Sequence, residues 1–162
     1  MRQGKELSAR VKHVDKRYGA RQSERFDPER AAKPDDPARF EYLPSEEVAT
    51  LLDIPAAGKV ADFGTGTGTY AIELARLRPD VEVLALDELP EMLDLLRAKS
   101  AAAVLTNLKP MLARDSGGLE KTIDRVLALN VLHELGDEAL RELAALLKPD
   151  GVRHGPAAHP LG

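Results

Sequence analysis

The sequence contains no cysteine, few aromatic residues and no cluster of potential metal ligands. Without cysteine, disulfide bonds, thiolate nucleophiles and zinc sites built on sulfur are excluded. The four histidines are His13, His133, His154 and His159. They lack the spacing of metal ligands, so we predict no metal site. Three tyrosines and three phenylalanines are the whole aromatic complement, which leaves few residues for an aromatic wall around a ligand.

A long apolar run and a dominant charge are also missing. No apolar stretch approaches the roughly 20 residues that a membrane-crossing helix needs. The polar residues 1–5 lack the apolar core of a secretion signal. The chain has 23 Lys and Arg against 27 Asp and Glu, and its net charge of -4 gives no general attraction to a phosphate backbone. We therefore expect a soluble, cytoplasmic protein that binds neither membranes nor nucleic acid.

What is present suffices for one domain, because 162 residues with 43% hydrophobic side chains can form one core of ordinary size. Periodic patterns are weakest in residues 1–44, which we interpret as an N-terminal extension. Residues 45–151 carry the regular patterns and form the predicted domain. The tail, residues 152–162, has two prolines, two glycines and no apolar alternation, so it cannot supply a buried strand.

Strand patterns alternate with helical patterns through residues 45–151. The predicted strands are 60–63, 81–86, 108–113 and 125–131, and helices are predicted to start at Ser45, after the glycines at 64–68, at Pro90 and after a cap at Asp137. The helix residues expected to face the core are Val48, Leu51, Leu52, Tyr70, Leu74, Leu77, Met92, Leu93, Leu95, Leu96, Leu140, Leu143 and Leu147. This alternation predicts an α/β fold with a doubly wound parallel sheet. Pro110 cannot donate to a strand ladder, so the third strand should lie at a sheet edge.

Sheets of this kind bind ligands beyond the carboxyl ends of their strands. The residues predicted to gather there are 64–68, 87–89, 114–115 and 130–134. The first group has the pattern G-x-G-x-G and opens a helix, where missing side chains let a ligand approach backbone N–H groups. The dinucleotide fingerprint would require a glycine at Thr69. Taken alone, the glycines are also compatible with a flexible turn.

Asp87 ends the second predicted strand, 23 positions beyond Gly64. At about this interval an acidic side chain reaches the ribose hydroxyls of an adenosine. A carboxylate suits this task because it accepts hydrogen bonds from two vicinal hydroxyls at once. The alternative interpretation is a solvated aspartate at a strand end.

Four segments together resemble the motifs of class I S-adenosylmethionine-dependent methyltransferases. They are VADFGTGTG (60–68), LDELPEML (86–93), DRVLALNVLHE (124–134) and LLKPDG (146–151). The similarity spans residues 45–151 and is closest to the broad group that includes the ubiquinone and menaquinone C-methyltransferases. It implies a Rossmann-like sheet, S-adenosylmethionine as cofactor and a small-molecule methyl acceptor.

The resemblance also implies roles for individual residues. Asp62 and the glycines would bind the methionine end and centre of the cofactor, Asp87 the ribose, Leu89 the face of the adenine and Asp115 its amino group. The cofactor-binding residues are Asp62, Gly64, Thr65, Gly66, Gly68, Asp87, Glu88, Leu89, Asp115 and Asn130. Phe40 and Tyr42 would belong to a lid that forms an apolar wall, or would simply pack on the first helix.

Methyl transfer is an in-line displacement, so alignment and exclusion of water matter most and no fixed base is required. His133 is a candidate base because its unperturbed pKa is about 6.5. Its alternative is a turn histidine. Asn130 would line the pocket where donor and acceptor meet, or cap a strand end.

The resemblance implies three further strands after Gly151, which residues 152–162 cannot supply. We therefore expect a sheet of order 3-2-1-4 in a C-terminally truncated chain, with compromised activity. The edge of the fourth strand, residues 126–129, would then be apolar and unprotected, which invites pairing with another chain, such as a second copy in a homo-oligomer, or aggregation. Two other functions stay open: a nicotinamide-binding oxidoreductase domain and a noncatalytic interaction module.

Overall fold

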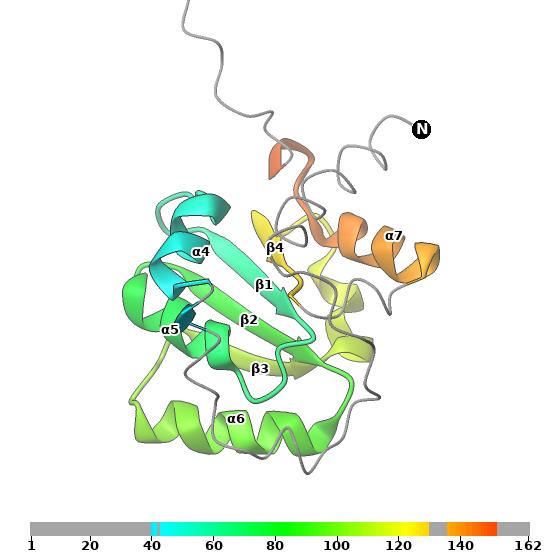
Figure 1. Ribbon diagram of the computed structural model, residues 1–162. Helices are drawn as coiled ribbons and strands as arrows, with labels where there is room; N and C mark the ends of the chain where they lie inside the picture. The colour runs from blue at the N-terminus through cyan, green and yellow to red at the C-terminus, as the bar shows by residue number, and fades with distance from the viewer. Residues whose placement is uncertain (1–39, 42, 130–135, 152–162) are drawn as a thin grey trace, which may run out of the picture.

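A four-stranded parallel sheet organises the molecule. The computed structural model describes residues 40–41, 43–129 and 136–151 (Figure 1). Their strands are β1 (Lys59–Phe63), β2 (Glu82–Asp87), β3 (Leu108–Leu112) and β4 (Arg125–Leu127). The α-helices are α4 (Ser45–Leu52), α5 (Thr69–Leu77), α6 (Pro90–Ala102) and α7 (Asp137–Leu146), with 3-10 turns η1 (Ala113–Leu119) and η2 (Pro149–Gly151). The sheet order β3-β2-β1-β4 confirms the predicted fold class and strand order.

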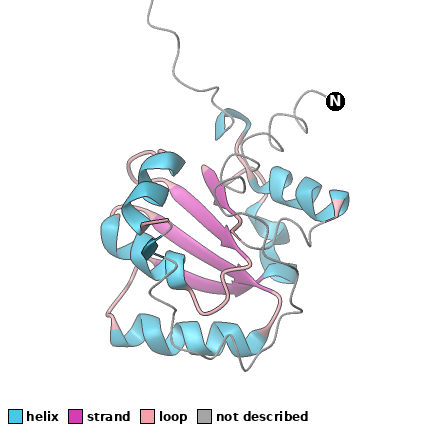
Figure 2. Ribbon diagram, viewed as in Figure 1, coloured by secondary structure: helices cyan, strands magenta, loops and turns pink. Residues whose placement is uncertain are grey.

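Helices cover both faces of the sheet (Figure 2). One apolar cluster joins Val60 and Val83 to Leu74 of α5 and Leu93 of α6, and α4 packs into the same cluster through Val48. The other cluster joins strand residues to the inner face of α7; it contains Ala61, Leu84, Leu86, Ile123, Leu143 and Leu146. Because β1 and β2 are covered on both sides, successive residues in their middle are apolar: Val60 and Ala61 in β1, and residues 83–86 in β2.

The two central strands end at the same level. In the parallel register, Phe63 of β1 pairs with Leu86 of β2, so the chain leaves β1 beside the last residue of β2, Asp87. On the other side of β2, Pro110 of β3 pairs with Ala85, and β3 lies at the edge of the described sheet. The edge position predicted from Pro110 is confirmed.

Several predicted inward-facing residues are exposed instead. Leu51, Leu77 and Leu95 have 54%, 39% and 40% of their surface exposed, because each lies beside the buried stripe of its helix rather than on it. In α7 the fully buried residues are Leu143 and Leu146, and Asp137 is the first helical residue after an N-cap at Gly136. The prediction of Asp137 as the cap was therefore wrong by one position.

The beginning of the β4 edge is partly covered. After α7 the chain runs parallel to the residues that precede β4: the N–H of Ile123 donates to the carbonyl of Leu146, and that of Lys148 donates to Ile123. Lys148 also places its Nζ 3.0 Å from the carboxylate of Asp124. The β4 strand itself ends at Leu127, earlier than predicted. Residues 152–162, on which the expectation of missing strands rests, lie outside the described residues.

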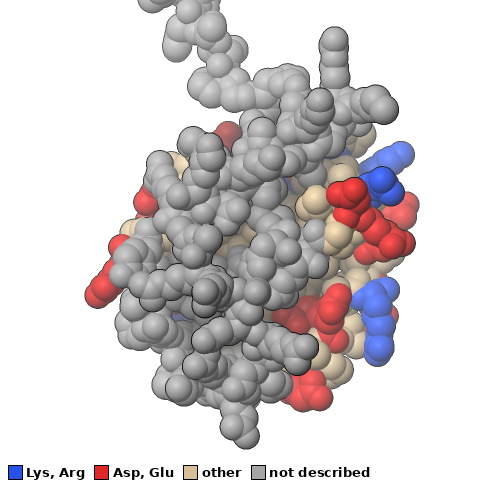
Figure 3. Space-filling view, turned by 45° about the vertical axis from the view of Figure 1, so that its right-hand side comes forward, with Lys and Arg blue, Asp and Glu red and all other residues tan. Residues whose placement is uncertain are grey.

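Surface charge is mixed on the described part of the face in Figure 3, where acidic and basic side chains are interspersed. Among the described helices, none is both long and apolar enough to cross a membrane.

Val104 offers a test of backbone strain. It follows the C-cap of α6, has φ of 54° and is 81% exposed. A β-branched residue resists this left-handed conformation, whereas glycine adopts it freely. We expect Val104→Gly to raise the free energy of unfolding by about 1 kcal/mol, measured by urea denaturation. Val104→Ala keeps a Cβ atom, so it should increase the free energy of unfolding by less than Val104→Gly does. A Val104→Gly protein less stable than the parent would contradict this account.

Candidate functional site

The loop of residues 64–68 joins β1 to α5 at the carboxyl edge of the sheet. Its three glycines have φ values of 71°, 57° and 84°, in the left-handed region that other residues resist. The N–H groups of Gly64 and Thr65 both donate to the carbonyl of Leu86, at 2.8 and 3.0 Å. The loop is therefore fixed to the end of β2.

Gly66 and Gly68 are required for different reasons. A Cβ at Gly68 would overlap the side chain of Leu96, so this glycine lets the loop pack on α6. Among the described residues, nothing lies within 4 Å of a Cβ placed at Gly66. With respect to this part of the chain the space beside Gly66 is open, and the missing side chain leaves backbone that a ligand could approach.

Asp87 lies directly beside this bare backbone. Its Oδ2 accepts a hydrogen bond from the N–H of Gly66 at 2.8 Å, and its Oδ1 accepts one from the N–H of Leu89 at 2.9 Å. The residue is 9% exposed. A carboxylate offers about four acceptor positions, so about two remain for a ligand. The closeness of Asp87 and the glycine loop expected from the sequence is confirmed.

Asp62 is a second carboxyl beneath the loop. It is 5% exposed, and the Thr65 hydroxyl donates to its Oδ2 at 2.8 Å. Burial raises the pKa of Asp62 to about 7; the bond from Thr65 opposes this shift and the negative charge of Asp87 adds to it. The two carboxyls therefore differ: Asp87 is held by backbone donors and Asp62 by a hydroxyl.

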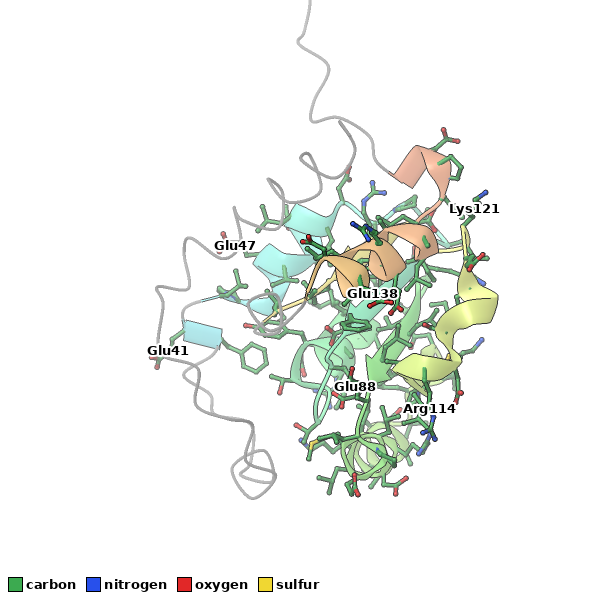
Figure 4. All side chains as sticks on the ribbon, turned by 90° about the vertical axis from the view of Figure 1, so that its right-hand side faces the viewer. Glu41, Glu47, Glu88, Arg114, Lys121 and Glu138 are labelled. Atoms are coloured by element: carbon green, nitrogen blue, oxygen red, sulfur yellow. The ribbon has the colours of Figure 1, made fainter. Side chains whose placement is uncertain are left out.

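The remaining predicted residues lie around this centre. Leu89 is half-buried at the start of α6, and Glu88 is exposed beside it; Figure 4 labels Glu88 and, on η1, Arg114. Asp115 is exposed on η1, which follows β3. The predicted Asn130 and His133 fall outside the described residues.

Of the two aromatic residues predicted to form an apolar wall or to pack on the first helix, only Phe40 is described; Tyr42 lies outside the described residues. The ring of Phe40 meets that of Tyr70 edge-on, with centroids 5.6 Å apart. The Tyr70 hydroxyl donates to the carbonyl of Leu43 at 3.0 Å. The segment before α4 is thus attached to α5, and not only to the first helix as the sequence suggested.

Some contributions to the site were missed by sequence reasoning. The donors to Asp87 are the backbone N–H groups of Gly66 and Leu89. Every residue type except proline carries such a group, so no sequence signal marks them. The close contact of Gly68 with Leu96 was missed as well. A glycine at the start of a helix is the one sign of such a close approach.

The shifted pKa of Asp62 predicts a pH-dependent stability. Between pH 3.8 and about 7 the folded protein keeps a proton on Asp62 that the unfolded chain has released. Raising the pH through this window should lower the free energy of unfolding, by up to about 1.4 kcal/mol per pH unit. In Asp62→Asn this contribution should be absent, which urea denaturation at about pH 5 and about pH 7 measures.

Two other described carboxyls titrate further from this window than usual. Hydrogen bonds from Arg78 and Lys109 hold the pKa of Asp80 and of Glu82 below their ordinary values. If the parent and Asp62→Asn lose stability in parallel as the pH rises, Asp62 does not carry the buried proton.

Comparison with known proteins gives a family match. The family described as methyltransferase domain matches residues 60–151. An uncharacterised methyltransferase of Mycobacterium tuberculosis is 33% identical over 111 residues, which are 67% of this chain and 42% of that protein. The demethylmenaquinone methyltransferase of Deinococcus radiodurans is 48% identical over 48 residues, which are 30% of this chain and 20% of that protein.

Solved structures share the fold. An S-adenosylmethionine-dependent methyltransferase from Aquifex aeolicus superposes with a TM-score of 0.69 at 28% identity, over 77% of this chain and 69% of that one. A putative methyltransferase from Methanococcus maripaludis gives a TM-score of 0.63 over 80% and 63% of the two chains; at 22% identity it supports the fold alone.

The chain spans between a fifth and about two fifths of these curated relatives. The family match covers more than half of the chain and includes β1, the glycine loop, β2 and Asp87. The chain therefore belongs to the class I S-adenosylmethionine-dependent methyltransferase domain family, whose cofactor is S-adenosylmethionine.

Proposed function

We propose that the carboxyl edge of β1 and β2 binds S-adenosylmethionine for the methylation of a small molecule. The observation that carries this proposal is the 2.8 Å hydrogen bond between the Gly66 N–H and Asp87 Oδ2. This bond joins a carboxylate, which can accept hydrogen bonds from sugar hydroxyls, to backbone that carries no side chain of its own. A nucleoside with an extended arm needs both features at once.

The chemistry of the residues fits the sugar of this cofactor. About two acceptor positions of Asp87 remain after its bonds to Gly66 and Leu89, and a ribose offers two vicinal hydroxyl donors. The backbone donors already fix the carboxylate, so it loses little side-chain freedom on binding. The open space above Gly66 leaves room for the chain that joins the sugar to the sulfur.

The positions of the predicted residues support one direction for the cofactor. Asp115 lies on η1 after β3, and Leu89 is the N-cap of α6; they suit the adenine amino group and the adenine ring. The glycine loop and Asp62 belong to β1 and its end, on the other side of β2 from β3, and suit the ammonium group of the zwitterionic amino-acid arm. Glu88 is exposed after β2 and would contribute at the rim of the ribose site.

The bound cofactor supplies an electrophilic methyl group on its sulfonium sulfur. The work of this chain is to hold that methyl in one orientation and to keep water away from it. Asp87 and the loop of 64–68 provide the orientation. No residue needs to act as a fixed base, and the roles suggested for Asn130 and His133 stay predictions.

The alternatives from the sequence have less support. A nicotinamide-binding domain would need a glycine where buried Thr69 begins α5, and family membership favours the methyltransferase. A noncatalytic interaction module and a homo-oligomer through the outer edge of β4 stay predictions. The methyl acceptor is not defined by any residue described above.

Removing the Asp87 carboxylate tests the sugar site. We expect Asp87→Ala to weaken binding of S-adenosylhomocysteine at least about tenfold, because hydrogen bonds to a charged group are lost. Isothermal titration calorimetry measures the affinity, and circular dichroism verifies folding. Asp94→Ala, an exposed aspartate of α6 paired with Arg97, is the matched control and should bind normally. Unchanged affinity in Asp87→Ala would sink the proposed site.

The two glycines should separate binding from folding. Gly66→Ala adds a methyl group in open space at φ of 57°, so we expect a stability loss of about 1 kcal/mol and a strong loss of cofactor affinity. Gly68→Ala overlaps Leu96 and should lose more stability. Urea denaturation and calorimetry on both variants measure this contrast. Normal cofactor binding by Gly66→Ala would show that the ligand does not cross the loop there.

A further inference from the structure

Asp62 and Asp87 stand at the same edge but in unlike surroundings. Two backbone N–H groups donate to Asp87, whereas the Thr65 hydroxyl donates to Asp62. A backbone N–H stabilises a carboxylate and cannot accept a proton from it. A hydroxyl can either donate to a carboxylate or accept from a carboxylic acid, so Thr65 serves both protonation states of Asp62.

The neighbours of Asp62 disfavour its negative charge. Its cross-strand partners are Ala85 of β2 and Leu127 of β4, both apolar, and the charge of Asp87 is repulsive. The other described charged residues that follow the strands at this edge are exposed and therefore screened by water; they are Glu88, Arg114, Asp115, Asp137 and Glu138. Figure 4 labels Glu88, Arg114 and Glu138 of these. Burial and these neighbours raise the pKa of Asp62 to about 7, so this carboxyl gains and loses its proton close to neutral pH.

We propose, on the basis of the function proposed above, that the ammonium group of the cofactor's zwitterionic amino-acid arm displaces the proton of Asp62, so that cofactor binding releases a proton. The proton leaves the Asp62 carboxyl for the solvent buffer, and the carboxylate that remains faces the ammonium group of the ligand. An opposite charge within about 4–6 Å favours the ionised form of a carboxyl. By thermodynamic linkage, a ligand that favours the carboxylate binds more tightly as the pH rises.

This coupling between ligand binding and the Asp62 proton distinguishes ligands that carry the ammonium group from ligands that lack it. S-adenosylhomocysteine carries the ammonium group, whereas 5′-methylthioadenosine has the same nucleoside and a neutral, truncated arm. Both can use Asp87, but only the first brings a cation to Asp62. As the pH rises toward neutrality, the affinity for S-adenosylhomocysteine should increase by up to about tenfold per pH unit. The affinity for 5′-methylthioadenosine should stay constant or decrease.

Calorimetry in buffers with different ionisation enthalpies measures the released proton. For the full chain at and below neutral pH, we expect up to about one proton released per bound S-adenosylhomocysteine and close to none per bound 5′-methylthioadenosine. Asp62→Asn should bind S-adenosylhomocysteine with close to no proton release. Asp94→Asn, on the exposed face of α6, should release as many protons as the parent.

The outcomes distinguish this inference from the proposed function. If S-adenosylhomocysteine does not bind to the folded chain, the proposed function itself fails. If S-adenosylhomocysteine binds with the same enthalpy in every buffer, or if Asp62→Asn still releases the proton, the proposed coupling is overturned. Binding of S-adenosylhomocysteine would in that case still support the proposed cofactor site. Should Asp62→Asn not fold, a carbon-13 NMR titration of the Asp62 carboxyl in the parent decides the question. Its pKa should fall when S-adenosylhomocysteine is added, and an unchanged pKa would overturn the inference.

Discussion

The site depends on one hydrogen bond, from the N–H of Gly66 to the carboxylate of Asp87. This bond joins two segments 21 residues apart, and it forms because β1 and β2 are adjacent parallel strands in a register that ends them together. The left-handed backbone of the loop turns the Gly66 N–H toward β2. If β2 were shifted by one residue, the Asp87 carboxylate would point to the other face of the sheet and the bond would be lost.

The buried position of Asp62 lowers the stability of the folded state when this carboxyl is ionised. A carboxyl with apolar neighbours on both adjacent strands destabilises the folded state when it ionises, which the raised pKa expresses. An apolar residue there would pack at least as well. Groups with shifted pKa values concentrate at functional sites, and the value near neutrality makes this carboxyl responsive to a nearby cation in the physiological range.

Much of this arrangement could be predicted from the sequence, because parallel topology follows from alternating patterns and the site follows from topology. The order of the strands, the edge position of Pro110 and the meeting of Asp87 with the glycines all belong to this class. The exposed Leu51 and Leu95 could not be predicted, since helical spacing alone does not decide how wide the buried stripe is. The left-handed backbone conformation of Val104 could not be predicted either. Valine gives no sign of this conformation, which follows from the way the chain leaves the end of α6.

The alternating glycines of the loop satisfy two constraints at once. Gly68 allows contact between the loop and Leu96, which fixes the start of α5 against α6. Gly66, two residues earlier, has no described atom within 4 Å of a Cβ placed on it, and its left-handed backbone angle is what favours glycine. One constraint comes from packing and the other from the backbone conformation of the loop. A glycine that packing does not require is therefore more informative about a ligand than one that packing requires. In this chain that glycine is Gly66, whose N–H donates to Asp87.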